Sequence, residues 1–285
     1  MPPYRSCRVP HFPAAEPAPL PVLEQPVQVT VTVPATGSRY AKRLEACFEA
    51  IWSQRGLPEG SEVETLLVWQ SAEDPPAGVQ VVIAQPDPGP FCLARARNIG
   101  ARGAAHDLIV FTDADIMLHP ETLVRAVARV RTRDCFVTCL TRMLPEGREA
   151  AHIAAHGYGG FLLVSREDFF EIGGYDEEYV GWGVEDNDLV DRLVWYGLEH
   201  VCLTETDGIV VEHQWHPEGT RNRTLLEKNR KRYWSMDSIL RNRDGWGELS
   251  FPDGPVLSWG RLNALPHEEE TNELRAPFRS GPDPI

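Results

Sequence analysis

Two aspartates separated by one residue, Asp113 and Asp115, directly follow an apolar run in the segment VFTDADIML. Side chains two residues apart in an extended segment point the same way, so these carboxylates can converge on one cation. Hard divalent cations prefer carboxylate and phosphate oxygens, and such an ion can neutralise a diphosphate as it departs. A pair of aspartates that only caps a loop is the structural alternative. The preceding run LIVF, typical of a buried strand, favours a metal site.

A second group of acids follows a flexible Gly-Trp-Gly in the segment GGYDEEYVGWGVEDNDLVDRL. Glu185, Asp186 and Asp188 stand at the start of a predicted helix, whose N-terminal dipole favours ionised carboxylates. A carboxylate beside a sugar-sized pocket can accept the proton of an attacking hydroxyl, which is general-base catalysis. Capping of the helix by Asp186 or Asp188 is the alternative, and the spacing alone does not decide between the two.

The elements that must position these acids alternate between strand and helix. Residues 27–33 (VQVTVTV) are predicted to form a strand that stops at Pro34, and the next helix carries its apolar face at Leu44, Cys47, Phe48 and Ile51. The segments ETLLVW, VQVVIA and LIVFT are further strands, with helices over about 91–105 and from Pro120 onward. This order predicts an α/β fold with a mostly parallel sheet and helices on both faces, and ligands that bind beyond the carboxyl ends of its strands.

The second half of the chain is less regular. The segments CFVTCL, GFLLV, VCL and IVV are predicted strands, and DNDLVDRLVWYG is a predicted helix that ends at Gly197. Residues 1–26 contain eight prolines and are expected to be a disordered arm, and residues 265–285 a disordered acidic tail. Residues 27–264 then form one domain, with a nucleotide-binding half over 27–118 and an acceptor half with a basic lid over 119–264.

Charge and cysteine usage exclude several classes of protein. The net charge of −14 argues against general binding to nucleic acid or to anionic membranes. Residues 221–243 break the trend with eight Lys and Arg against two acids, which indicates either a solvated helix face or a local phosphate-binding element. The six cysteines show no zinc spacing, and Cys135 and Cys139 would lie roughly 13 Å apart in one strand, too far for a disulfide. With no predicted membrane span or signal peptide, the chain is expected to be cytoplasmic.

The two acidic segments together resemble the signature segments of the GT-A fold β-1,4-galactosyltransferases and of the related bacterial family that includes chondroitin-type polymerases. The similarity covers roughly residues 27–235. Three further segments occur in the order found in that family: VPATGSR, FCLARARNIGA and YGGFLLVSREDFFEIGGYDEEY. The resemblance implies a Rossmann-like sheet that binds a nucleotide-sugar, merged with an acceptor-side half.

The resemblance also implies roles for individual residues. Asp113 and Asp115 match the metal-binding pair, and Asp186 matches the catalytic base, with Glu185 beside it. Glu185, Asp186 and Asp188 would hold the acceptor sugar together with Trp182, which matches the tryptophan of a mobile loop that closes over the donor. The other positions that match donor-binding segments are Pro34, Ala35, Thr36, Arg39, Arg95, Arg97, Asn98, Thr112, Ala114, Gly159 and Gly160.

A histidine completes the expected metal site. Relatives supply one from a strand-to-loop junction at the place of His213, and His216 could substitute for it. The basic stretch that follows would be a lid that orders with metal and diphosphate, with His216, Arg221 and Arg223 as candidate phosphate contacts.

This chain departs from the family pattern at several positions. Val184 replaces a common glycine, Asn187 replaces an acid, and the segment WQSAED lacks the usual aspartate pair. The chain also shows neither the membrane anchor nor the disulfides of the secreted members of the family.

The sequence therefore predicts an enzyme that moves a hexose or N-acetylhexosamine from a UDP-sugar to a hydroxyl of a carbohydrate, glycoconjugate or peptide, using Mn²⁺ or Mg²⁺ and inverting the anomeric centre. No nucleic-acid partner is expected. The alternatives are a retaining GT-A transferase, a nucleotidyltransferase, and a non-catalytic sugar-binding protein on a decayed transferase fold. No glycine-rich, lysine-bearing phosphate loop near the N-terminus supports the nucleotidyltransferase.

Overall fold

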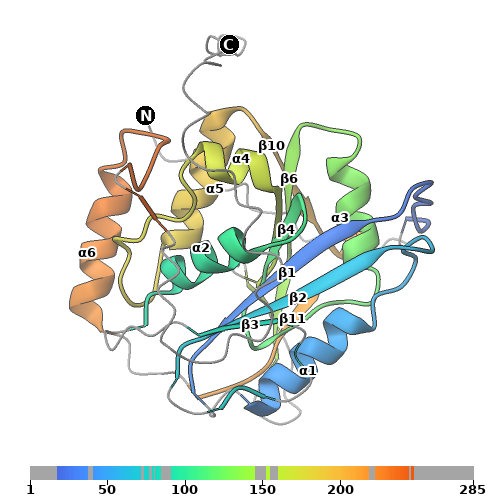
Figure 1. Ribbon diagram of the computed structural model, residues 1–285. Helices are drawn as coiled ribbons and strands as arrows, with labels where there is room; N and C mark the ends of the chain where they lie inside the picture. Colours follow the sequence, from blue (N-terminus) through green and yellow to red (C-terminus); the bar gives the residue numbers. More distant parts are fainter. Residues whose placement is uncertain are drawn as a thin grey trace.

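The computed structural model describes residues 18–37, 41–71, 74–76, 79, 81–84, 91–144, 152–154, 160–217, 222–243 and 245–246. A seven-stranded sheet in the order β10-β6-β9-β4-β1-β2-β3 forms its centre (Figure 1). Its strands are β1 (Gln28–Ala35), β2 (Glu62–Trp69), β3 (Val81–Ala84), β4 (Leu108–Phe111), β6 (Cys135–Cys139), β9 (Leu162–Ser165) and β10 (Glu199–Leu203). All pairings are parallel except those of β9, which runs antiparallel to β4 and β6. The predicted α/β class with a mostly parallel sheet is confirmed.

A smaller sheet lies next to the first, in the order β5-β11-β7-β8. Its strands are β5 (Ile116–Met117), β7 (Thr141–Met143), β8 (His152–Ala154) and β11 (Val211–His213). The short 3-10 helix η3 (Glu205–Asp207) precedes β11. The antiparallel pairing of β11 with β5 places His213 opposite Ile116, next to the end of the predicted metal strand.

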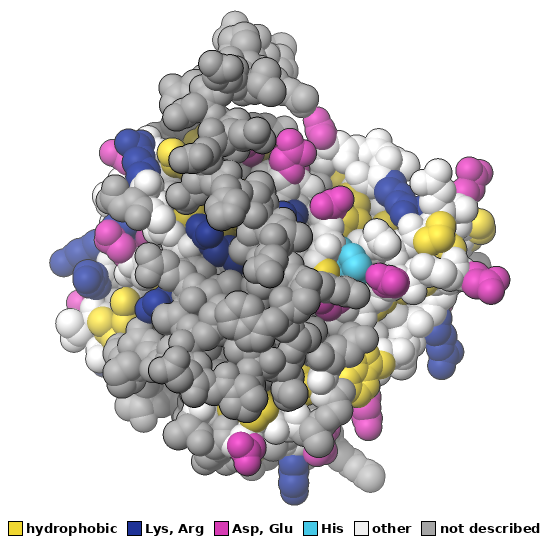
Figure 2. Space-filling model, in the orientation of Figure 1, with side chains coloured by type: hydrophobic (Ala, Val, Ile, Leu, Met, Phe, Trp, Pro, Cys, Tyr) yellow, Lys and Arg dark blue, Asp and Glu magenta, His cyan; other side chains and the backbone are white. Residues whose placement is uncertain are grey.

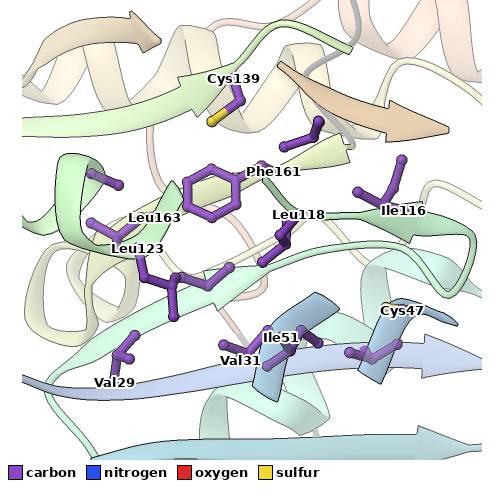
Figure 3. Close-up of a cluster of buried hydrophobic side chains, with 14 of the residues drawn as sticks. Val29, Val31, Cys47, Ile51, Ile116, Leu118, Leu123, Cys139, Phe161 and Leu163 are labelled. Atoms are coloured by element: carbon purple, nitrogen blue, oxygen red, sulfur yellow. The ribbon is translucent and has the colours of Figure 1, made fainter. Parts of the chain in front are cut away.

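Helices cover both faces of the large sheet, as predicted. One core contains β1 side chains, the predicted face of α1 (Ala41–Trp52) and the apolar side of α3 (Thr122–Val130), and Figure 3 shows Val31, Ile51, Leu123 and Phe161 within it. The opposite core packs α2 (Leu93–Gly103), α4 (Arg166–Glu171) and α5 (Glu185–Tyr196) on β4 and β9. The last helix, α6 (Arg223–Trp234), packs against α5.

The first strand runs through Pro34 instead of stopping there. Thr32 accepts a hydrogen bond from the backbone of Thr112 on the β4 side, and alternate residues of a strand face the same neighbour. The nitrogen of Pro34 therefore faces the side where pairing with β4 has already ended at Phe111, so the missing N–H leaves no ladder bond unmade.

Part of the proline-rich arm makes contacts with the folded domain. In residues 18–26, the carbonyls of Pro19, Gln25 and Pro26 accept hydrogen bonds from Arg125 and Arg131 of the α3 region, at 3.2, 2.9 and 2.6 Å. Leu23 packs against the core, which supplies the apolar contact that the proline-rich composition concealed. Residues 1–17 and the predicted tail over 265–285 lie outside the described residues.

Two further observations bear on the predictions from composition. Cysteines 47, 92, 135, 139 and 202 are all free, as expected. Within the described part of the chain, no helix combines the length and the apolar character needed to cross a bilayer.

His200 makes the fold sensitive to acid. Its ring stacks on Phe136 at 4.8 Å in β6, and burial lowers its pKa from 6.5 to about 4. Between pH 6.5 and 4 the unfolded chain therefore binds a proton that the folded chain excludes, so stability falls as pH falls. We expect His200→Phe, which keeps the stack, to reduce the slope of unfolding free energy against pH in this window by at most about 1.4 kcal/mol per unit. Urea unfolding at several pH values measures this slope. If the slope of His200→Phe equalled that of wild type, or if His119→Gln changed it equally, His200 would not be the group responsible.

Candidate active site

The guanidinium of Arg97 joins the two predicted acidic segments. Its side chain is fully buried, and it donates to Asp113 at 2.8 Å, lies 3.5 Å from Glu185 and makes a short hydrogen bond to Asp186. Asp113 follows β4, and the other two acids begin α5. The Arg97 side chain therefore links the carboxyl end of the central sheet to helix α5. Sequence reasoning counted Arg97 only as a donor contact; no local pattern indicates its acidic partners, which are distant in the chain.

The helix α2 brings Arg97 to this place by lying very close to the sheet. A Cβ added at Gly100 would lie 3.0 Å from two side-chain atoms of Thr32 in β1, tighter than most real contacts. The absence of a side chain at Gly100 thus allows α2 to approach the strand, one turn after Arg97.

The acid cluster begins α5 without capping it. The N-cap residue is Val184, in the left-handed conformation at φ 67°, and its side chain makes no cap hydrogen bond. Capping by Asp186 or Asp188 is therefore wrong for this helix. A β-branched residue in this region costs on the order of 1–3 kcal/mol, and such strain concentrates at functional sites. Glycine, which the family resemblance described above implies at this position, adopts this conformation without strain.

The two adjacent acids have different electrostatic environments. Burial raises the pKa of Glu185 to about 8, an effect that Asp186 reinforces and Arg97 opposes. Burial also raises the pKa of Asp186, but Arg97 and a hydrogen bond from Glu185 lower it. Both carboxyl groups are therefore more basic than ordinary carboxylic acids, and the guanidinium favours the ionised form of Asp186. A carboxyl group with a raised pKa is suited to proton transfer near neutral pH.

Three side chains form a candidate metal group: Asp115, His213 and His216. Their ligand atoms lie within 4.8 Å of one another, and Asp115 Oδ2 is 3.6 Å from His213 Nε2 and 3.2 Å from His216 Nε2. The backbone of Gln214 donates to the carbonyl of Asp115 at 2.8 Å, which fixes the loop that carries both histidines. One carboxylate and two imidazoles suit Mn²⁺ better than Mg²⁺, which prefers oxygen ligands alone. As a metal ligand, His216 was predicted only as a substitute for His213, whereas the structure places both histidines in the same group.

Asp113 and Asp115 face different partners. The segment after β4 turns instead of continuing extended, because the backbone N–H of Ile116 donates to the carbonyl of Asp113 at 3.1 Å. The extended geometry from which the metal pair was predicted is therefore absent here. Asp115 meets the histidines and Asp113 meets Arg97, although a role for Asp113 at the metal stays a prediction.

Several predicted donor-binding residues make contacts within the protein. The amide of Asn98 is buried; it donates to Tyr175 O and Glu177, and accepts from Tyr175 N at 2.8 Å. Thr36 donates to Gln70 O at 2.7 Å, and Thr112 donates to Gly160 O at 2.8 Å. Their roles toward a donor stay predictions, and these contacts fix the backbone beside the strand ends.

The remaining predicted donor-binding positions divide by exposure. Pro34, Ala35 and Ala114 are buried, and Arg95 is half-buried. Arg39, Gly159 and Arg221 lie outside the described residues. Arg223 is exposed at the first turn of α6.

Asp188 is completely buried. It accepts hydrogen bonds from Arg192 at 2.6 Å, Tyr179 at 3.2 Å and Arg241 at 3.3 Å. Arg192, also fully buried, donates in addition to the carbonyls of Ile172 and Gly174. This network ties α5 to the loop between α4 and α5 (residues 172–184), so Asp188 holds the candidate site in place, and its predicted contact with an acceptor stays a prediction.

The loop that carries Trp182 rests on α6. Asn229, an almost fully buried side chain that sequence reasoning missed, donates to Val180 O at 3.2 Å and to Gly183 O at 3.3 Å. The indole of Trp182 is 54 % exposed between these two anchor points. The loop thus presents an aromatic face directly before Glu185.

Part of the predicted basic lid forms ion pairs within the protein. Arg232 pairs with Asp176 at 2.6 Å and with Glu178, and Arg241 pairs with Asp176 at 3.0 Å. These two arginines therefore stabilise the loop over residues 172–184. The acids that neutralise them lie far away in the sequence. The run of basic residues alone therefore could not show that these two arginines form ion pairs.

Known proteins resemble this chain over part of its length. A family model described as the N-terminal domain of galactosyltransferase matches residues 150–216, which include the acid cluster and both histidines. Bovine (Bos taurus) β-1,4-galactosyltransferase 1 is 27% identical over 122 residues, or 41% of this chain and 28% of that protein. The chain spans less than half the length of the first curated relatives it matches.

Solved structures share the fold at low sequence identity. GalNAc-T7 with UDP, GalNAc and Mn²⁺ aligns with a TM-score of 0.56 and 17% identity, covering 74% of this chain and 48% of that one. Mannosyltransferase PcManGT from Pyrobaculum calidifontis, in complex with GDP-Man and Mn²⁺, aligns with a TM-score of 0.53 and 18% identity, covering 71% and 62%. The chain therefore has the GT-A fold, as the sequence predicted.

Removal of one imidazole tests the metal group. We expect His216→Gln to weaken Mn²⁺ binding at least tenfold, because one of the three converging ligands is lost. Isothermal titration calorimetry of the full chain measures the dissociation constant. His119→Gln, a histidine outside the group, should bind Mn²⁺ as wild type does; unchanged affinity in His216→Gln would remove this residue from the ligand set.

Proposed function

We propose that this protein is a metal-dependent glycosyltransferase that moves a hexose or N-acetylhexosamine from a UDP-sugar to an acceptor hydroxyl, with inversion at the anomeric carbon. The observation that carries the proposal is the bridge made by Arg97. Through it, the strand end that would bind the metal and two adjacent acids, buried Glu185 and partly exposed Asp186, stand in one site at the carboxyl edge of a GT-A sheet. The matched segments of the galactosyltransferase family support the same reaction class.

On the acceptor side, Asp186 takes the proton of the attacking hydroxyl. Its side chain is 21% exposed, so a substrate can reach it, whereas Glu185 is almost covered. The charge on Arg97 and a hydrogen bond with Glu185 both favour ionised Asp186, while burial raises its pKa and makes it basic enough to accept a proton. Proton removal, bond formation to the anomeric carbon and departure of the UDP oxygen then belong to one displacement, which inverts the configuration.

On the donor side, Asp115, His213 and His216, with Asp113 nearby, would hold the metal ion. The bound ion supplies positive charge for the diphosphate of the leaving nucleotide. The chain itself contributes the strand-end backbone around Thr36 and Thr112, which borders the nucleotide-binding edge of the sheet. Trp182 on the adjoining loop would cover the donor sugar and exclude water.

Replacement of the base tests the proposed reaction directly. We expect Asp186→Asn to lower kcat by a factor of about 10² to 10⁴ while donor binding with Mn²⁺ persists, because an amide cannot accept the proton. Turnover is measured as UDP release from UDP-galactose and UDP-N-acetylhexosamines, with sugar acceptors and with water, and binding as a thermal shift. Asp107→Asn, at the opposite end of β4, is the matched control. Near-normal turnover in Asp186→Asn would exclude it as the base, and NMR of the product tests inversion.

The charge of Arg97 should appear in the pH profile of the reaction. Activity is lost as pH falls and Asp186 becomes protonated; Arg97 lowers this pKa, so Arg97→Gln should shift the acid limb of kcat/KM to higher pH. Arg97→Lys keeps a positive charge and should shift the limb less. Arg102→Gln, in the last turn of the same helix, should leave the limb in place. An unshifted limb in a folded Arg97→Gln variant would show that Arg97 does not set the charge of the base.

A further inference from the structure

The outer face of α6 is cationic, in a protein whose net charge is −14. The inner face is occupied by Leu225 and Leu226, which approach the Gly-Trp-Gly loop, and by buried Asn229 and Tyr233. The helix period places residues 223, 227, 230 and 234 in one outward stripe, with 228 and 231 beside it. This outer face consists of exposed Arg223, Glu227, Lys228, Arg230, Lys231 and Trp234.

The four cations of the outer face are not neutralised by their surroundings. Among the described residues, none of them forms an ion pair, whereas Arg232, on the flank of the same helix, is bound to Asp176 and Glu178. Figure 2 shows Lys and Arg side chains projecting along the left edge of the molecule, where α6 lies in Figure 1. The stripe thus carries a local excess of positive charge directed into solvent.

An exposed tryptophan completes the stripe. The indole of Trp234 is 66% exposed at the last turn of α6 and contacts the ring of Tyr233. An indole is large and apolar with one polar N–H, so it is stable at the boundary between lipid headgroups and acyl chains. Cations and an aromatic on a convex helix fit a broad anionic surface, whereas a polysaccharide chain requires a groove.

This face also lies beside the acceptor side of the candidate site. Asn229 on the inner side of α6 holds Val180 and Gly183, on either side of exposed Trp182, and Glu185 follows directly. A surface bound to the outer face would therefore lie one helix away from the loop that precedes the acids.

We propose that the outer face of α6 docks this protein onto a membrane that contains anionic phospholipid. The attraction comes from the four exposed cations of this face, and Trp234 enters the headgroup layer. Because the rest of the molecule is acidic, binding has one orientation, in which α6 faces the lipid and the other surfaces are repelled. The association is peripheral, since the apolar side of α6 is used for packing inside the protein. The inference does not depend on the proposed reaction.

Vesicle co-sedimentation of the full chain tests the docking. The probes are vesicles of phosphatidylcholine alone and vesicles that also contain about a third phosphatidylglycerol. At an anionic surface, each Lys or Arg raises the partition coefficient of the protein about fivefold. We expect binding only to the anionic vesicles, and a loss with rising salt. Arg230→Gln with Lys231→Gln should reduce the partition coefficient about tenfold or more, and Trp234→Ala should reduce it independently of salt.

The matched control removes two cations elsewhere. Arg55→Gln with Arg133→Gln changes the net charge equally at exposed positions outside α6 and should bind as wild type does. Circular dichroism melts confirm that each variant is folded. Equal binding to neutral and anionic vesicles, or an equal loss in the control, would overturn the proposal. Retention by heparin or nucleic acid without vesicle binding would also overturn it, because the face would then serve a polyanionic chain.

Discussion

A buried guanidinium is the interaction on which the site depends. A charge removed from water is costly unless it is paired, and loss of one partner of such a pair costs about 3–5 kcal/mol. Arg97 meets this requirement with acids from two regions, Asp113 after β4 and Glu185 with Asp186 at α5. The same contacts that compensate its burial therefore also bring the chemical groups together. Folding and assembly of the site are in this sense one event.

The loop over residues 172–184, which lies beside this ionic cluster, is held mostly by side chains that bind its backbone groups. Asn98 binds the backbone of Tyr175 from α2, and Arg192 binds the carbonyls of Ile172 and Gly174 from α5. Asn242 donates to Gly173 and Tyr175 at 2.7 Å in each case. The loop has little regular structure of its own, so its shape is imposed by rigid neighbours, as pre-organisation of a binding site requires.

The fold could be predicted because hydrophobic periodicity reports burial directly. Leu44, Cys47, Phe48 and Ile51 recur at helical spacing and are all buried, and runs such as LIVF form central strands. The reversed direction of β9 could not be predicted, because a short apolar run reads the same in parallel and antiparallel pairings. Pro34 within β1 depended on where the neighbouring strand ends, which is a property of the sheet.

The candidate site was less predictable because its residues meet across the fold. The acids were identified from local motifs, but the backbone turn at Asp113 shows that the segment is not extended, as the prediction had assumed. The basic run could not be divided by sequence into Arg232, which is neutralised by distant acids, and Lys231, which is exposed beside it. The sequence gives the number of charged side chains, whereas only the folded structure shows which of them form ion pairs.

The anchoring of the Gly-Trp-Gly loop by later residues bears on how small a working unit of this protein can be. A polypeptide that ended after β11 would retain every acid of the candidate site, together with His213. It would lack Asn229 and Asn242, whose side chains bind the backbone between Gly173 and Gly183, and Arg241, which pairs with Asp176 and Asp188. Such a fragment would possess the reactive groups without the brace that orients them. The smallest unit with an intact candidate site is therefore larger than the stretch that contains its acids.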